Sequence, residues 1–227
     1  MIHLLHGAAG APGDWDPFIP LLQSEDVRTV DLCEMDASGL DDFAASLNSF
    51  VSPGDTIIGY SMGGRLALHA LLADPHPWSR AVIISAHTGI IDAADREKRE
   101  QADLKWATLA NSNWDEFILK WQCQPIFGGK PLPWSRSADR DFGARVQRCF
   151  TSWSLGRQRP LLPELKSIEI PVLWISGKLD TKFSAIAENG ASRIAQGQLA
   201  VIPNAGHRCP WDQPELTAGV IRGFLSQ

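Results

Sequence analysis

Residues 55–72 read DTIIGYSMGGRLALHALL, and this stretch decides the fold. Its first four residues, 55-DTII-58, are β-branched and apolar, as is typical of a strand buried on both faces. Residues 65–72 are apolar and typical of a helix. Between them lies 59-GYSMG-63, a G-x-S-x-G pattern. In this context the pattern predicts a strained strand-to-helix turn that exposes the Ser61 hydroxyl, with glycines on both sides to avoid collisions. The alternative is an ordinary glycine-rich loop.

A serine hydroxyl needs a histidine to take its proton, and the histidine needs a carboxylate to fix its tautomer. The sequence offers both downstream. Asp180 follows an apolar strand-like run at 170–176, and His207 follows another at 198–202. We therefore predict a Ser61–His207–Asp180 triad in the order Ser, Asp, His along the chain. The alternatives are a structural histidine and a turn aspartate.

Charge developing on a reacting oxygen needs backbone N–H donors beside the serine. We predict that these donors are Met62, directly after Ser61, and Ala8, in the small-residue loop 6-HGAAG-10. His6 is expected to orient that loop, whereas the sequence leaves the role of His87 undecided.

Strand and helix patterns alternate along the chain on both sides of residues 88–160. Strand-like runs lie at 2–5, 27–32, 55–58, 80–85, 170–176 and 198–202, and helical patterns at 15–22, 40–50 and 213–225. This alternation predicts an α/β fold with a doubly wound, mostly parallel sheet. Residues 88–160 break it, with five of the nine tryptophans (Trp106, Trp114, Trp121, Trp134 and Trp153) but no buried strand. We expect one α/β core from residues 1–87 and 161–227, with a helical cap inserted at 88–160.

Composition narrows the class of function. The net charge of −5 argues against nucleic acid or an anionic membrane as a partner. Four scattered cysteines without zinc-site spacing predict free thiols and no metal, and nothing indicates another cofactor. The N-terminus lacks the features of a signal peptide, and no run approaches eighteen apolar residues. We expect a cytoplasmic protein that is a monomer or a small homo-oligomer.

The predicted cap carries the positive charge of an acidic chain. Residues 88–160 hold twelve Lys and Arg against nine Asp and Glu, whereas the remainder holds nine against seventeen. The arginines in its second half are Arg136, Arg140, Arg145, Arg148, Arg157 and Arg159. Such a group above a cleft would attract a small anionic substrate. The alternative is a set of solvated surface arginines.

Over nearly its whole length the chain resembles the α/β-hydrolase superfamily. Within it, the chain resembles the 2-succinyl-6-hydroxy-2,4-cyclohexadiene-1-carboxylate synthases of menaquinone biosynthesis. The shared marks are 59-GYSMGGR-65, Arg99 seven residues before Trp106, Trp121 followed by 124-QPIF-127, and 180-DTKF-183. The resemblance implies a carbon–oxygen lyase whose triad abstracts a proton and eliminates pyruvate from a polycarboxylate.

The resemblance also implies a set of substrate-binding residues. They are Tyr60, Arg65, Arg99, Trp121 and one further arginine, for which Arg148 is preferred to Arg145. The sequence supports Arg65 independently, because it lies four residues after Ser61, on the same helix face. A guanidinium there suits a carboxylate better than a neutral ester. The alternative for Arg65 is an ion pair on the helix surface.

Two features depart from the family pattern. Members usually have two strands ahead of the loop that corresponds to residues 6–10, the His-Gly loop. Here only the strand-like run at 2–5 precedes that loop, which predicts a shortened sheet. The usual Asp-x-Pro-Gly-x-Gly stretch is replaced by 31-DLCEMD-36. These departures bear on substrate identity more than on the triad. Two other functions stay open: a small carboxylesterase or thioesterase that uses the same residues through an acyl-enzyme, and a non-catalytic ligand receptor on a hydrolase scaffold.

Overall fold

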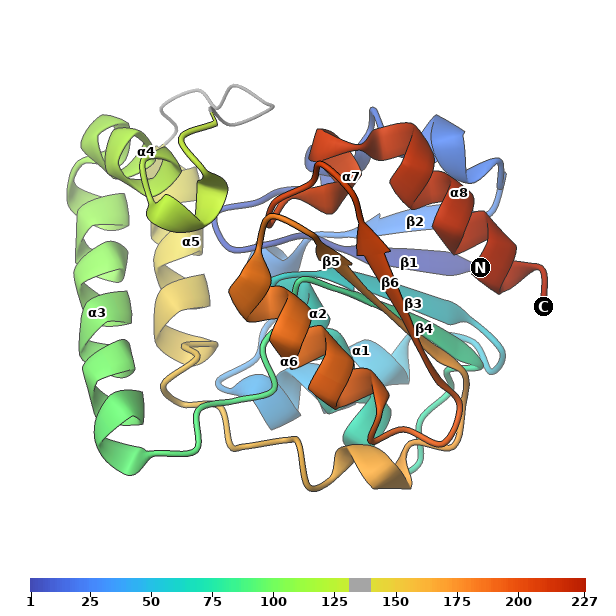
Figure 1. The fold of residues 1–227 in the computed structure, drawn as a ribbon. Helices are drawn as coiled ribbons and strands as arrows, with labels where there is room; N and C mark the ends of the chain where they lie inside the picture. The colour runs from blue at the N-terminus through green and yellow to red at the C-terminus, as the bar shows by residue number, and fades with distance from the viewer. Residues whose placement is uncertain (131–139) are drawn as a thin grey trace.

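A computed structural model describes residues 1–130 and 140–227. Within these ranges one sheet forms from six parallel strands, in the order β2-β1-β3-β4-β5-β6 (Figure 1). The strands are β1 (Ile2–Leu5), β2 (Val27–Val30), β3 (Thr56–Tyr60), β4 (Arg80–Ile84), β5 (Val172–Gly177) and β6 (Gly197–Ile202). The α/β-hydrolase fold class is confirmed. The strand order reverses between β1 and β3, and ligands bind at such switch points, beyond the carboxyl ends of the strands.

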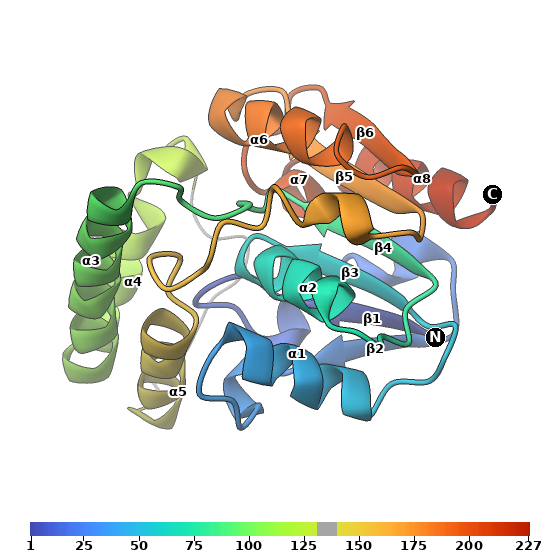
Figure 2. The same cartoon turned by 90° about the horizontal axis from the view of Figure 1, so that it is seen from below.

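Helices cover both faces of the sheet (Figure 2). One face packs on α1 (Leu40–Ser49), α2 (Met62–Leu72) and α6 (Thr181–Ala191). The other face packs on α7 (Cys209–Asp212), α8 (Pro214–Leu225) and two 3₁₀ turns near the N-terminus. Because the central strands are buried on both sides, their sequences are continuously apolar rather than alternating.

Two local predictions differ from the structure. Residues 15–22 do not form a helix but two 3₁₀ turns, Pro12–Trp15 and Ile19–Leu22, because Pro17 and Pro20 lack the N–H groups that an α-helix needs. The helix after Ser61, α2, begins at Met62, three residues earlier than the predicted start at Arg65. Gly63 and Gly64 belong to this helix, and a Cβ on Gly63 would lie 2.4 Å from the carbonyl oxygen of Leu5.

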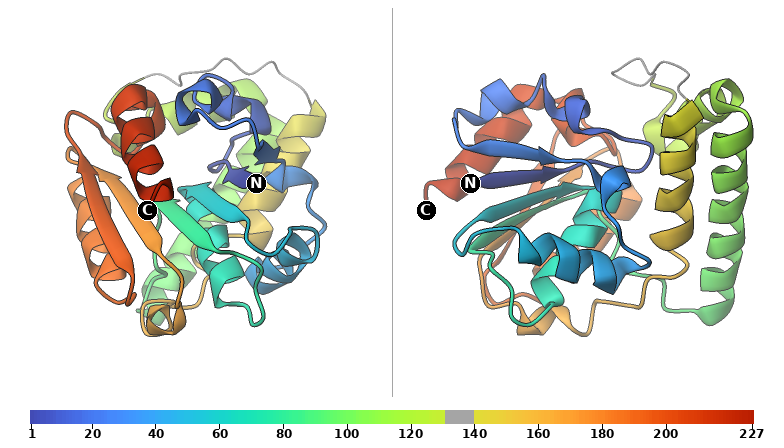
Figure 3. Two further views of the ribbon diagram at one scale, coloured as in Figure 1. Left: turned by 90° about the vertical axis from the view of Figure 1, so that its right-hand side faces the viewer. Right: turned by 180° about the vertical axis from the view of Figure 1, so that it is seen from behind.

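Among the described residues, three α-helices lie between β4 and β5 in the chain and stand apart from the sheet layers (Figures 1 and 3). They are α3 (Ala93–Ser112), α4 (Trp114–Gln122) and α5 (Arg140–Ser152). They share an apolar cluster centred on Phe117, Val146 and Phe150, which Ala9 of the His-Gly loop joins. The two chain termini lie at the opposite end of the molecule (Figure 3). Trp134 and Arg136 lie outside the described residues, as does the Arg140 side chain.

The chain enters and leaves this helical segment at one place. The N–H of Leu161, on the exit, donates to the carbonyl oxygen of Thr88, on the entry, at 2.7 Å. Gly89 has a φ of 99°, and a Cβ there would lie 2.5 Å from the carbonyl oxygen of Arg159. A glycine is therefore required where the two connections pass each other.

No described helix combines the length and the apolar character needed to cross a membrane. The cysteines are free thiols, and those of Cys33 and Cys149 meet across the boundary between the core and α5, with their sulfurs 3.1 Å apart.

Candidate active site

Ser61 occupies the single residue between β3 and α2. Its φ of 53° and ψ of −108° lie in a region that side-chain-bearing residues rarely adopt. The flanking glycines allow this turn, because a Cβ on Gly59 would lie 2.4 Å from the Gly63 carbonyl oxygen. The surrounding packing thus holds the serine at the carboxyl edge of the sheet, next to the switch point between β1 and β3.

Ser61, His207 and Asp180 form one hydrogen-bond chain. The Ser61 Oγ lies 3.0 Å from His207 Nε2, and His207 Nδ1 lies 2.8 Å from Asp180 Oδ2. Asp180 also caps α6, since its Oδ1 accepts from the Phe183 N–H at 3.2 Å. With one oxygen on the helix and the other on the imidazole, the carboxylate is fixed in the orientation that keeps the Nδ1 proton towards it. His207 Nε2 is then the free acceptor for the serine proton.

His207 is only 3% exposed, and the ring of Phe183 lies 4.5 Å from its own. Burial lowers the pKa of His207 below its ordinary value of 6.5, and the nearby Asp180 carboxylate opposes part of this shift. The imidazole is therefore neutral, and able to accept a proton, at neutral pH.

This pKa shift gives the first prediction. A histidine base works only when it is neutral, so activity is lost as pH falls through its pKa. Because that pKa is lowered, we expect the acid limb of kcat/KM against pH to have its midpoint below 6.5, rather than at the unperturbed value that the sequence alone suggests. Steady-state kinetics from pH 4 to 8 would measure it. A midpoint above 6.5, or a flat profile, would contradict the assignment.

The two predicted oxyanion donors flank this serine. Met62 is the first residue of α2, where backbone N–H groups have no acceptor within the helix. Ala8 follows β1, and both residues line the cavity beside Ser61. His6 holds the loop as predicted: its Nε2 accepts from the Leu32 N–H at 3.1 Å, and its Nδ1 lies 2.9 Å from the Gly7 carbonyl oxygen.

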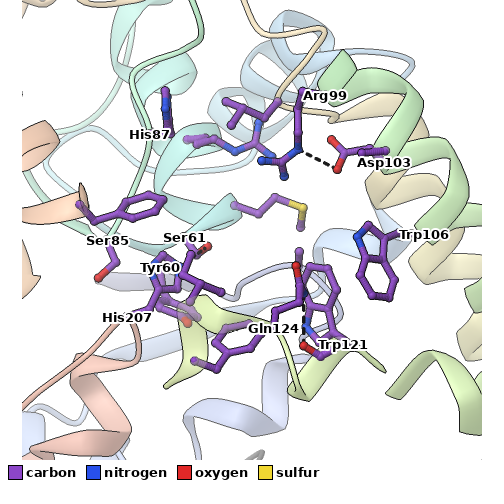
Figure 4. Close-up of a pocket in the computed structure, with 18 of the residues that line it drawn as sticks. Tyr60, Ser61, Ser85, His87, Arg99, Asp103, Trp106, Trp121, Gln124 and His207 are labelled. Carbon is purple, nitrogen blue, oxygen red and sulfur yellow. Dashed lines mark hydrogen bonds and ion pairs between the residues drawn. The ribbon is translucent and has the colours of Figure 1, made fainter. Parts of the chain in front are cut away.

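A cavity of about 330 Å³ opens above Ser61 and His207 (Figure 4). The core supplies its floor, including Tyr60, whose buried ring packs against His207 and Trp211. The helical insertion supplies the opposite wall, in which Trp121 meets Trp106 edge to face with ring centroids 5.2 Å apart. A substrate in this cavity would contact apolar rings around a few charged groups, as is usual for small-molecule sites.

Arg65 and Arg99 carry the positive charge of the cavity. Arg65 is 7% exposed, and burial, reinforced by the charge of Arg99, lowers its pKa to about 9. It therefore remains charged at neutral pH. Arg99 comes from α3, and its Nε donates to Asp103 Oδ1 at 2.9 Å (Figure 4). The structure thus brings Tyr60, Arg65, Arg99 and Trp121 to one cavity with Ser61 and His207.

The other predicted arginine does not reach this cavity. The Arg148 guanidinium instead donates to the carbonyl oxygen of Cys33, and Arg145 lies 3.2 Å from Glu34. Arg157 and Arg159 pair with Glu100 and Glu164. Arg148 is thus not among the residues that line the cavity, and the prediction that it binds substrate gains no support from the structure. Most of these arginines therefore form ion pairs with neighbouring carboxylates. The count of charges in residues 88–160 could not reveal this pairing.

Three residues around the guanidiniums were assigned no role from the sequence. Asp103 lies one helical turn after Arg99, a spacing that could have predicted the pair. His87 lines the cavity, and burial and the nearby cations lower its pKa to about 4, so it is neutral. Gln158 is fully buried and bonds to Arg65. Nothing in the sequence pattern indicated it.

Among the described side chains, one group has the residue types and the spacing of a metal site. His6, Asp31 and Cys33 lie close enough to share an ion. Both ring nitrogens of His6 are already used, one towards the Gly7 carbonyl and one by the Leu32 N–H. This donor set does not fit a metal without breaking the loop that carries Ala8.

Comparisons with known proteins agree with this geometry. Residues 4–220 match the model of the alpha/beta hydrolase family. Two similar proteins are named 2-succinyl-6-hydroxy-2,4-cyclohexadiene-1-carboxylate synthase. That of Photorhabdus laumondii is 29% identical over 98% of this chain and 84% of its own. That of Serratia proteamaculans is 28% identical over 97% and 91%.

Two solved structures share the fold. MenH from S. aureus has a TM-score of 0.89 at 24% identity, over 99% of this chain and 92% of its own. The carboxylesterase CesB from Bacillus subtilis has a TM-score of 0.66, also at 24% identity, over 99% and 82%. The expected resemblance to the synthases is confirmed. The family model matches almost the whole protein, and Ser61, His207 and Asp180 lie within the matched residues. This protein therefore belongs to the alpha/beta hydrolase family of enzymes.

Proposed function

We propose that this enzyme is a carbon–oxygen lyase of menaquinone biosynthesis, which eliminates pyruvate from a polycarboxylate intermediate in the cytoplasm. The observation that carries the proposal is Arg65: a buried guanidinium that lines the same cavity as Ser61 and His207 and pairs with no carboxylate among the described side chains. A buried charge without a counter-ion is costly, and an anionic substrate would supply one. The names of the similar synthases support the same conclusion.

The triad would act here as a base. His207 takes the hydroxyl proton of Ser61 while the serine oxygen removes a proton from a substrate carbon. A C–O bond conjugated with that carbon then breaks, and its electron pair leaves with the oxygen of the departing group as an enolate. This enolate takes up at carbon the proton that His207 holds and becomes pyruvate. The N–H groups of Ala8 and Met62 would hold the enolate-like charge that develops in between. Arg65 and Arg99 would hold carboxylates and thereby orient the carbon that loses its proton.

An esterase or thioesterase could use the same three residues for acyl transfer, so the decisive measurement compares products. The purified enzyme would be given the pyruvate-bearing intermediate and, separately, p-nitrophenyl acetate. The proposal expects steady catalytic formation of pyruvate and no comparable turnover of the ester. A burst of p-nitrophenol followed by efficient turnover, without pyruvate from the intermediate, would identify an esterase.

Arg65→Ala should separate the two chemistries further. It removes a charge-assisted contact of about 1.5–3 kcal/mol, so kcat/KM for the polycarboxylate should fall about ten- to a hundredfold. A neutral ester has nothing for this guanidinium to hold, so its kcat/KM should change little. Steady-state kinetics on both substrates would measure the difference.

Arg65→Lys is the matched control. It keeps the charge but lacks the planar fork of donors, so it should restore only part of the lost activity. Raised salt should weaken capture of the polycarboxylate and leave the ester unaffected. Equal losses on both substrates in Arg65→Ala would mean that Arg65 stabilises helix α2 and does not bind a substrate carboxylate.

A further inference from the structure

We infer that Gln158 is a positioning residue for Arg65: it fixes the guanidinium towards the cavity without cancelling its charge, so that a substrate carboxylate becomes the counter-ion. This inference rests on the proposed function in assuming an anionic substrate. It adds a residue that does not itself line the cavity but decides the charge that the cavity presents.

The contacts of Arg65 carry the inference. Its Nη1 donates to Gln158 Oε1 at 2.9 Å, and its Nη2 donates to the backbone carbonyl of Trp153 at 2.7 Å. Both acceptors are neutral, and both come from the segment in which the chain returns from α5 to the core. Arg65 itself belongs to α2 of the core. The direction in which its guanidinium points is therefore set by two acceptors from the segment that leaves the helical insertion.

Gln158 is itself held rigidly. Its side chain is 0% exposed, and its Nε2 donates to the backbone carbonyl of His87 at 3.1 Å while its Oε1 accepts from Arg65. The amide thus bridges the guanidinium to the entry of the helical insertion. Because one end donates and the other accepts, turning the amide over would break both bonds. Its orientation is therefore fixed by its partners.

Arg99 provides the contrast within the same cavity. It is half exposed and pairs with Asp103, the one carboxylate that lines the cavity among the described residues. The second oxygen of Asp103 accepts from the Ser154 hydroxyl at 2.8 Å, which fixes this ion pair. The uncompensated positive charge of the cavity is accordingly that of Arg65. A carboxylate at position 158 would remove it, whereas an amide of the same shape orients the cation and leaves it charged.

The test compares Gln158→Glu with Gln158→Met, each alone and combined with Arg65→Met. Gln158→Glu places a carboxylate against the guanidinium with almost no change of shape. Gln158→Met removes both hydrogen bonds of the amide. Binding of tricarballylate, a simple polycarboxylate probe, would be measured by calorimetry, alongside kcat and KM for the pyruvate-bearing intermediate and for p-nitrophenyl acetate.

We expect Gln158→Glu to weaken tricarballylate binding, and to raise KM for the intermediate, about ten- to a hundredfold, since the substrate carboxylate then competes with an internal one. Its kcat/KM for the neutral ester should stay within about twofold. Gln158→Met should weaken binding less. In the Arg65→Met background Gln158→Met should have no further effect, because residues that act through one another are not additive.

Equal losses on the neutral ester and the anionic ligands would overturn the inference, since a purely structural glutamine predicts them. Additive effects of Gln158→Met in the Arg65→Met background would overturn it too, as would wild-type protein that binds no tricarballylate. Failure of the proposed lyase has a different signature: wild-type enzyme that binds tricarballylate but forms no pyruvate. The binding measurements and the double-variant comparison would still decide the role of Gln158 in that case.

Discussion

Ser61→Ala and His207→Ala should each lower kcat by about 10²–10⁴ or more, the scale expected when a positioned base or its partner is removed. Their direct contact at 3.0 Å makes them one proton-transfer unit. The double variant should therefore be little worse than either single variant. Pyruvate release under saturating substrate would measure the losses.

The fold should survive both changes, and circular dichroism with thermal melting provides the control. Ser61→Ala removes only one hydroxyl, although the strained turn remains because alanine carries the same Cβ. Binding of tricarballylate should persist in both variants, because Arg65 and Arg99, the cations that line the cavity, are intact. Near-full turnover in either variant would show that the Ser61–His207 pair is not the base.

Asp180→Asn should cost up to about 10⁴ in kcat. Asparagine can still cap α6, because its oxygen can keep the bond from the Phe183 N–H. Its NH₂ group then faces His207 Nδ1, where the carboxylate oxygen now lies at 2.8 Å. A donor at that place moves the imidazole proton to Nε2, so the nitrogen facing Ser61 can no longer accept.

Stability and turnover separate the two roles of Asp180. An unchanged melting temperature with a large loss of kcat is the expected result for Asp180→Asn, since the helix cap is kept and only the tautomer is wrong. Asp180→Ala is the comparison, because it loses the cap as well and should cost about 0.5–2 kcal/mol of stability. If Asp180→Asn kept most of its activity, another group would have to orient His207.

The sequence by itself determined the fold class and the three residues of the candidate catalytic site. The apolar run before Ser61, the glycines on both sides of it and the polar residues that follow two later strands were enough to predict that Ser61, Asp180 and His207 meet. The physical reason is that parallel strands all end at the same edge of a sheet, so residues just past their ends lie close together whatever separates them in the chain.

Only the tertiary structure decided how the charges are used. Arg148 and Arg65 are both candidates for binding an anion in the sequence, yet the first bonds to the Cys33 carbonyl and the second lines the cavity. Gln158 gave no signal, because its partners come from α2 and from the residues just after β4. Strand ends are placed by local pattern and sheet geometry, whereas ion pairs depend on which side chains meet across packed elements. That information exists only once the helical insertion has docked on the core.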